Sequence, residues 1–234
     1  MKLYEEAQKL NIEIDENKAA EFEKYKEMML EYNKAVNLTA ITEDDEIKEK
    51  HFLDCAALTL CPELFEGCSL IDIGAGAGFP SIPVKIVRKD IKLTMLDSLN
   101  KRIVFLNSVK DALNLEAAQA IHMRAEDGGQ DKNLREKFDI ATARAVADLS
   151  VLAELALPFV KVGGYFIALK GSDISEELDN AKTAIKTLGG KTQRVQEIIL
   201  PSGIKHSFVV IKKLEKTPSK YPRKAGKPTK DPIR

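Results

Sequence analysis

The stretch Leu70–Ile86, LIDIGAGAGFPSIPVKI, runs from an apolar segment through a glycine-rich turn into a second apolar segment. The first segment predicts a buried strand, and the second predicts the start of a helix. A strand, glycine turn and helix in this order place backbone N–H groups and a helix N-terminus at the carboxyl edge of a sheet. Such a turn lets a ligand come close to the backbone, so the function depends on which ligand it holds.

Strand and helix patterns alternate on both sides of this turn, from about residue 68 to residue 214. The predicted strands are SLIDI, KLTML, AQAIHM, FDIATA, GYFIALK, TQRVQEIIL and HSFVVIKK, and the predicted helices cover about residues 79–88, 100–113, 148–158 and 174–188. This alternation predicts an α/β fold with a parallel sheet covered by helices on both faces. Only a short turn around PSGI separates the last two strands, which predicts a terminal antiparallel hairpin at the sheet edge.

Three regions differ in pattern. Residues 1–66 predict an N-terminal helical cap, because Phe22, Tyr25 and Met29 recur at three- and four-residue spacing. Residues 67–214 form the α/β domain. Residues 215–234 predict a basic C-terminal arm: from Lys216 on there are seven basic residues against the single Asp231, with four of the nine prolines. This composition predicts a flexible arm until a partner orders it.

The composition is that of an ordinary globular protein, with 44% hydrophobic and 31% charged residues and a formal net charge of zero. No apolar run approaches the ~20 residues that cross a bilayer. The N-terminal residues are acidic where a signal peptide needs a basic and then an apolar segment. We therefore expect a cytoplasmic protein. The three cysteines form no CxxC pair and have no histidine at ligand spacing, so we expect buried free thiols and no metal site.

Two cofactor classes compete for the glycine turn. The dinucleotide fingerprint G-x-G-x-x-G would put its third glycine at Phe79, where a large side chain defeats close packing, so NAD or FAD fits poorly. The pattern present is D-I-G-A-G-A-G-F, which is typical of S-adenosylmethionine-dependent methyltransferases. Asp72 would receive the ammonium group of the methionine part, and the turn formed by Gly74, Gly76 and Gly78 would admit the cofactor chain.

Two further strand ends support S-adenosylmethionine. Asp97, followed by Ser98, ends the second strand about twenty residues past the turn, where a carboxylate accepts both ribose hydroxyls. The third strand leads into Arg124–Asp127, where a backbone N–H and a carboxylate, at Ala125 and Glu126, would read the adenine edge.

The loop after the fourth strand, ATARAVADLS, bears on the methyl acceptor. It lacks the Asn/Asp-Pro-Pro-aromatic pattern of many amine methyltransferases, and all three cysteines precede the glycine turn, which argues against methylation of pyrimidine carbon 5. The loop holds no evident general base. An acceptor with a free lone pair, such as guanine N7, needs none, and the enzyme would then work by positioning and by stabilising the shift of positive charge.

Nearly the whole chain resembles the RsmG (glucose-inhibited division protein B) family of bacterial guanine-N7 methyltransferases that act on small-subunit (16S) ribosomal RNA. The matching stretches are YNKAVNLTAI (32–41), HFLDC (51–55), IDIGAGAGFPSIPVKI (71–86), LDSLNKRIVFL (96–106), TARAV (142–146), ALKG (168–171) and YPRKAGKP (221–228). The resemblance implies a class I S-adenosylmethionine-dependent (Rossmann-like) fold with a seven-stranded sheet. It implies cofactor contacts at Gly74, Phe79, Ala125, Glu126 and Arg144. Cys55 departs from the serine that is common in the family.

Geometry limits the role of Arg144. A bidentate Arg–guanine contact uses O6 and N7 together, and would occupy the lone pair that must attack. We therefore expect Arg144 to orient the cofactor carboxylate or an RNA phosphate and to leave N7 free.

For RNA binding we expect contacts from the arm and from the edges of the site. In the arm, basic residues are interleaved with an aromatic residue, a pattern that suits phosphate neutralisation and base stacking. The candidates for RNA binding are Arg223, Lys224 and Lys227 of the arm, together with Lys170 and His51. His51 would form a wall over the acceptor base. The partner would be ribosomal RNA, free or within an assembled or assembling 30S subunit. Two alternatives stay open: a methyltransferase acting on a small molecule or protein, and a non-catalytic RNA-binding assembly factor.

Overall fold

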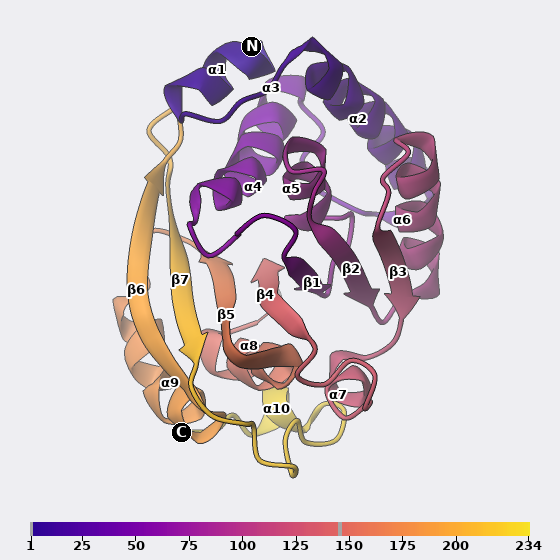
Figure 1. Ribbon diagram of the computed structural model, residues 1–234. Helices are drawn as coiled ribbons and strands as arrows, with labels where there is room; N and C mark the ends of the chain where they lie inside the picture. Colours follow the sequence, from indigo (N-terminus) through magenta and orange to yellow (C-terminus); the bar gives the residue numbers. More distant parts are fainter. Residues whose placement is uncertain (1, 145–146) are drawn as a thin grey trace.

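The computed structural model describes residues 2–144 and 147–234 and contains one mixed sheet between helices (Figure 1). Its strands are β1 (Ser69–Ile73), β2 (Lys92–Asp97), β3 (Ala118–His122), β4 (Phe138–Arg144), β5 (Val160–Lys170), β6 (Gly190–Ile199) and β7 (Lys205–Lys213). They lie in the order β3-β2-β1-β4-β5-β7-β6. The first five are parallel, and β7 is antiparallel to both β5 and β6. The predicted sheet and its terminal hairpin are confirmed.

The strand sequences match their places in the sheet. In β4, a central strand, every residue is buried except the half-buried Arg144, as expected where helices cover both faces. In β6, the edge strand, exposed and half-buried residues alternate for most of its length. Neighbouring residues of β1 contribute to different cores: Leu70 belongs to the apolar cluster on one face of the sheet and Ile71 to the cluster on the other. This is the two-residue period of a strand buried on both sides.

Helices fill the two layers. On one face α5 (Ser81–Val87) and α6 (Asn100–Ala112) contact α2 (Glu16–Val36), and on the other α8 (Leu149–Ala156) packs on α9 (Ser175–Thr187). Two short helices, α7 (Ala125–Gly128) and α10 (Lys227–Lys230), lie with the C-terminal segment, far from α2 in Figure 1. None of the helices within the described ranges is long and apolar enough to cross a membrane.

The N-terminal region is helical, as predicted. It contains α1 (Leu3–Lys9), α2 (Glu16–Val36), α3 (Asp44–Glu46), a π-helical turn (Ile47–Leu53), α4 (Asp54–Ala56) and a 3₁₀ turn (Ala57–Leu60). Phe22, Tyr25 and Met29 are fully buried and share a core cluster with Leu70 of β1. The cap therefore shares one core with the sheet, with α2 packed on α5 and α6, and the division of the chain at residues 66 and 214 stays a prediction.

The cysteines are buried free thiols, as expected. Burial raises the pKa of Cys55 well above its usual range and that of Cys61 to about 12, so both thiols are neutral. Cys55 is fully buried beside the π-helical turn and is part of the core.

The expectation of a flexible C-terminal arm is wrong. Tyr221 and Thr217 are buried, and Arg135 donates hydrogen bonds to the carbonyl oxygens of both. Arg223 forms an ion pair with Glu154, its Nη2 lying 2.6 Å from Oε2. Glu154 sits on the apolar helix α8 and is only 1% exposed, so its carboxylate needs a partner, and the tail supplies one. Composition alone does not reveal such a partner elsewhere in the chain.

Candidate active site

The glycine turn after β1 is held against the end of β2. The N–H groups of Gly74 and Ala75 donate to the carbonyl oxygen of Leu96 at 2.8 and 3.0 Å, and the N–H of Gly76 donates to Asp97 Oδ2 at 2.9 Å. The φ angles of Gly74 and Gly76 are +73° and +59°, a region that glycine enters without strain. The turn is thus a fixed backbone cradle.

Gly78 has a different task from the two glycines before it. A Cβ at this position would lie 2.4 Å from Ile82 Cδ1 and 3.1 Å from the Tyr25 hydroxyl. Tyr25 in turn donates a 2.6 Å hydrogen bond to the carbonyl oxygen of Ala77. Gly78 therefore lets the turn pack against α5 and the cap, and it does not line the cavity that the turn forms.

A cavity of about 430 Å³, here called the turn cavity, opens at this cradle. It is lined by Leu38, Thr39, His51, Gly74, Ala75, Gly76, Ala77, Phe79, Asp97, Ser98, Arg102 and Arg144. Its size falls within the range of small-molecule and cofactor sites. Six of the predicted cofactor residues meet here: Gly74, Gly76, Phe79, Asp97, Ser98 and Arg144.

Asp97 is oriented by its surroundings. Its Oδ2 accepts from the Gly76 N–H, its Oδ1 accepts from the Leu99 N–H at 2.9 Å, and Arg102 Nη1 lies 3.3 Å from Oδ2. A carboxylate has about four acceptor sites, so these bonds leave capacity for a ligand hydroxyl. Arg102, which no sequence pattern indicated, is the third residue of α6.

Asp72, a predicted cofactor residue, is fully buried beneath the turn and does not line the turn cavity. Its Oδ2 accepts a 2.5 Å hydrogen bond from Ser81 Oγ, whereas Oδ1 is the one buried side-chain nitrogen or oxygen in the described ranges without a hydrogen-bond partner. Burial raises the pKa of Asp72 to about 7, although the Ser81 hydrogen bonds and the charge of Arg144 act in the opposite direction. An orphaned carboxylate oxygen beside a glycine cradle fits a ligand that brings a cationic donor.

Ala125 and Glu126 start α7 and do not line the turn cavity. Glu126 Oε1 accepts a 3.0 Å hydrogen bond from the Gly226 N–H, so the C-terminal tail holds this carboxylate.

Arg144, at the end of β4, joins the cap to the turn. Its Nη1 donates to the Lys50 carbonyl oxygen at 3.1 Å and lies 3.4 Å from Asp54 Oδ2, and its Nη2 lies 3.1 Å from His51 Nδ1. The guanidinium also stands over the Phe79 ring, 4.7 Å from its centroid. The next two residues of the TARAV stretch, 145 and 146, are outside the described residues.

His51 is neutral in this arrangement. Burial, followed by the charge of Arg144, lowers the pKa of His51 to about 4. Because a guanidinium only donates, His51 Nδ1 accepts from Arg144, and its Nε2–H then donates to Thr39 Oγ1 at 2.8 Å. The imidazole also stacks on Phe79 with ring centroids 4.4 Å apart. His51 is thus a fixed part of the wall.

A second cavity of about 460 Å³, here called the strand-end cavity, lies on the other side of Arg144 and His51, which line both. Its lining residues are Ile41, Lys50, His51, Asp54, Arg144, Leu169, Lys170, Gly171, Ile204 and His206. They come from the cap, from the carboxyl ends of β4 and β5, and from the start of β7. In a parallel sheet this edge is where ligands bind.

Comparison with known proteins identifies the family. Residues 18–206 match the model described as rRNA small subunit methyltransferase G, GidB. The ribosomal RNA small subunit methyltransferase G of Alkaliphilus oremlandii is 52% identical over 233 residues, which cover 99% of this chain and 98% of the relative. That of Clostridium perfringens (strain 13 / Type A) is 50% identical over 226 residues, covering 96% and 95%. This chain belongs to the rRNA small subunit methyltransferase G family.

The predicted resemblance is therefore confirmed. The protein is an S-adenosylmethionine-dependent methyltransferase, as predicted. Solved structures confirm the class I fold. A SAM-dependent methyltransferase from Aquifex aeolicus superposes with a TM-score of 0.52 at 14% identity, over 72% of this chain and 93% of that one. TrmN from Thermus thermophilus gives a TM-score of 0.52 at 16% identity, over 69% and 48%.

The basic residues proposed for RNA binding fall into two groups. Lys170 forms a 2.5 Å ion pair with Glu177, and Lys227 forms one of 2.7 Å with Asp231, as Arg223 does with Glu154. Lys224 is exposed, as are Lys220 and Lys230 of the same tail, and among the described residues none of these three forms an ion pair. Lys227 is exposed too but is paired, so Lys220, Lys224 and Lys230 are the better candidates for phosphate contacts.

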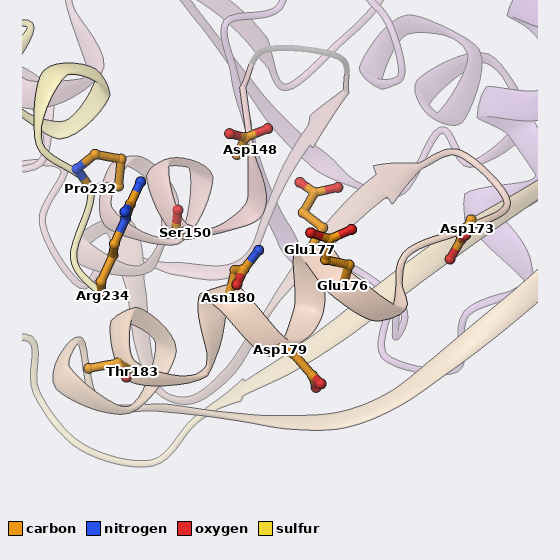
Figure 2. Close-up of a pocket in the computed structure, with 10 residues that line it drawn as sticks. All are labelled: Asp148, Ser150, Asp173, Glu176, Glu177, Asp179, Asn180, Thr183, Pro232 and Arg234. Carbon is orange, nitrogen blue, oxygen red and sulfur yellow. The ribbon is translucent and has the colours of Figure 1, made fainter.

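A third cavity lies away from the glycine turn, between α8 and α9 (Figure 2). Asp148, Glu176, Glu177 and Asp179 line it, with Arg234 of the C-terminus. Its carboxylates would repel a phosphate backbone, so it is no candidate for the RNA site.

Proposed function

We propose that this protein transfers the methyl group of S-adenosylmethionine to N7 of a guanine in small-subunit (16S) ribosomal RNA. The observation that carries the proposal is the pair of adjoining cavities that share Arg144 and His51. One has the glycine cradle and the Asp97 carboxylate, which suit S-adenosylmethionine, and the other is a separate space beside it for an acceptor base.

In this proposal the cofactor lies along the turn cavity. Asp72 provides the partner for the methionine ammonium, the backbone of Gly74 and Gly76 with the packing of Gly78 admits the chain, and Asp97 with Ser98 holds the ribose hydroxyls. The orphaned Asp72 oxygen and the oriented Asp97 carboxylate support these roles.

The adenine end of the cofactor would reach α7. Ala125 would contribute its N–H and Glu126 its carboxylate to the adenine edge, with Phe79 packing at the inner end of the cavity. Glu126 keeps one oxygen for this, since only its Oε1 is engaged by Gly226.

The acceptor guanine lies in the strand-end cavity with N7 toward the wall formed by Arg144 and His51. Bound S-adenosylmethionine supplies a methyl group on a sulfonium centre, and the protein contributes orientation. N7 already carries a lone pair, so no general base is required, and holding the base and the methyl in line lowers the barrier. Arg144 already donates hydrogen bonds from its Nη atoms to Lys50, His51 and Asp54. These bonds support a role in positioning the cofactor or a phosphate, with N7 left free.

The RNA backbone would meet lysines around this face. Lys224 of the C-terminal tail is exposed and suits a phosphate contact. Arg223, Lys227 and Lys170 hold ion-pair partners within the protein, so they would bind RNA only by exchanging or sharing them. The substrate would be ribosomal RNA, free or within an assembled or assembling 30S subunit, and a stacked guanine in it must be exposed for access.

The proposal is tested by incubating the protein with labelled S-adenosylmethionine and small subunits that lack N7-methylguanine, followed by nucleoside analysis. Label in 7-methylguanosine at one site is the expected result. Label in another nucleoside would overturn the N7 assignment and keep the cofactor. Transfer to a protein or small molecule, or cofactor binding without transfer to naked RNA or to subunits, would support the alternative acceptors or the non-catalytic assembly factor.

A further inference from the structure

Asp54 and His206 form a hydrogen-bonded pair in the strand-end cavity. Asp54 starts α4 and is 3% exposed, whereas His206 lies 152 residues later at the start of β7. His206 Nδ1 and Asp54 Oδ1 are 2.6 Å apart, and the other oxygen of Asp54 is 3.4 Å from Arg144 Nη1. Cofactor binding and the in-line attack described above use neither Asp54 nor His206.

The pair fixes the imidazole. An ionised carboxylate only accepts hydrogen bonds, so His206 Nδ1 carries the proton that Asp54 receives. In the neutral ring the lone pair is then on Nε2. Within the described ranges no residue forms a hydrogen bond with Nε2, and His206 lines the cavity. A carboxylate that holds Nδ1–H and makes Nε2 a better acceptor is the arrangement of the hydrolase triads.

Methylation of guanine N7 creates a need for such an acceptor. The N7 lone pair forms the new N–CH₃ bond, the bond from the methyl carbon to sulfur breaks with its electron pair left on sulfur, and the positive charge passes to the purine. That charge makes guanine N1–H a stronger hydrogen-bond donor. A hydrogen-bond acceptor opposite N1 therefore stabilises the transition state more than it stabilises the bound substrate. This difference is the condition for catalysis.

We propose that His206, held by Asp54, accepts a hydrogen bond from N1–H of the acceptor guanine and stabilises the charge that develops on it. The inference rests on the proposed N7 methyl transfer. N1 and N7 lie on different rings of the purine, so a base with N7 toward Arg144 and His51 extends its N1 edge away from them. His206 lines the strand-end cavity but not the turn cavity, as this orientation requires.

The same contact selects guanine. Adenine has a lone pair in place of a hydrogen at N1, so it would face the Nε2 lone pair with no bond formed and both groups desolvated. Sites built to accept a particular hydrogen reject analogues that lack it strongly.

The contact requires neutral His206. The hydrogen bond to Asp54 raises the pKa of His206 above its ordinary value, so protonation removes the acceptor as the pH falls through that raised pKa. The other ionisable groups that line the cavity are Lys50, His51, Arg144 and Lys170. Burial and the charge of Arg144 lower the pKa of His51 to about 4, and the pKa of Arg144 is raised above its already high ordinary value, so neither group titrates near His206.

The test compares His206→Leu, which has no acceptor, with His206→Gln, whose amide oxygen can accept from N1–H. Lys182→Gln is the control, because this exposed side chain lies on α9 and lines neither cavity. Rates of 7-methylguanosine formation on small subunits are measured from pH 5.5 to 8.5 at saturating substrates, and S-adenosylmethionine affinity is measured by calorimetry.

We expect kcat of His206→Leu to fall on the order of 10- to 100-fold, the value of a hydrogen bond to a charged group. His206→Gln should retain more activity than His206→Leu and lose the acid limb of the pH profile, with cofactor affinity unchanged in both. If the wild type forms 7-methylguanosine and His206→Leu matches its kcat and pH profile, the role of His206 is overturned and the function stands. If the wild type forms none, the proposed function fails and the role of His206 with it.

Discussion

The turn cavity and the strand-end cavity share a wall but are built from different parts. Backbone N–H groups, glycines with positive φ, and the carboxylate of Asp97 that fastens the turn form much of the turn cavity. Side chains from the cap, β4, β5 and β7, joined by ion pairs and histidine hydrogen bonds, form the strand-end cavity. Single side-chain changes should therefore alter the second cavity selectively, whereas the first should respond mainly to changes in the backbone or in its buried carboxylates.

The largest effect is expected at the shared wall. Arg144→Ala removes a hydrogen-bond partner of His51 and the guanidinium partner of Asp54, and should lower the free energy of unfolding by about 3 kcal/mol, since the buried Asp54 carboxylate then keeps only its hydrogen bond to His206. It should also abolish methyl transfer. Urea denaturation and the nucleoside assay measure the two effects.

Arg88→Ala is the control for this change. Arg88 pairs with Asp90 nearer the surface, and its loss should cost less than about 1 kcal/mol. An Arg144→Ala protein as stable as the wild type would show that the two cavities do not depend on their common wall.

The buried carboxyl group of Asp72 should make the free energy of unfolding depend on pH. Its pKa is about 7 in the folded protein, against 3.8 as the ordinary value, so the folded state binds more protons between these values. The free energy of unfolding should therefore fall as the pH rises from about 4 to about 7, by an upper limit of roughly 4 kcal/mol. Asp72→Asn should remove this slope.

A bound cofactor ammonium would favour the ionised Asp72, so S-adenosylmethionine should raise the melting temperature more at pH 8 than at pH 5. Thermal unfolding with and without cofactor measures both slopes. Equal stabilisation at the two pH values would contradict the role given to Asp72.

Gly78→Ala tests the backbone character of the turn cavity. The added Cβ meets Ile82 at 2.4 Å and also forces a residue with a side chain to φ +100°. Overpacking and strain together should cost about 3 kcal/mol and weaken cofactor binding.

Gly163→Ala separates the two causes, because Gly163 has φ +92° but nothing within 4 Å of the added Cβ. It should cost only about 1–2 kcal/mol, from the backbone alone. Equal losses of stability in chemical denaturation would mean that close packing at Gly78 is unimportant.

The smallest effect concerns the tail. Replacing Lys220, Lys224 and Lys230 by glutamine should leave stability unchanged and reduce the slope of log affinity against log salt by about 0.7 for each lysine that contacts a phosphate. Removing the whole tail would be uninformative, because Tyr221 and Arg223 anchor it to the core.

Glutamine at Lys182, Lys186 and Lys191 is the matched control, since these exposed lysines lie on α9 and β6. If both triple variants shift the salt slope equally in filter binding to small-subunit RNA, the tail has no specific part in RNA binding.

The two cavities also differ in how far the sequence predicts them. Gly74 directly follows β1 and Asp97 ends β2, and parallel strands bring their carboxyl ends to one edge, so a local pattern places these residues correctly. His206 was missed because no local pattern connects it to Asp54, 152 residues earlier. The tail was misjudged for the same reason: its composition is that of a flexible segment, and only the fold brings Glu154 to Arg223.

The most direct test of the account is a crystal structure of the protein with S-adenosylhomocysteine and guanosine monophosphate. We expect the cofactor sulfur beside Arg144 and His51, the guanine in the strand-end cavity with N7 toward that sulfur, and the Arg144 guanidinium away from N7. A guanidinium hydrogen-bonded to N7 in that pose, or a cofactor bound outside the turn cavity, would contradict it.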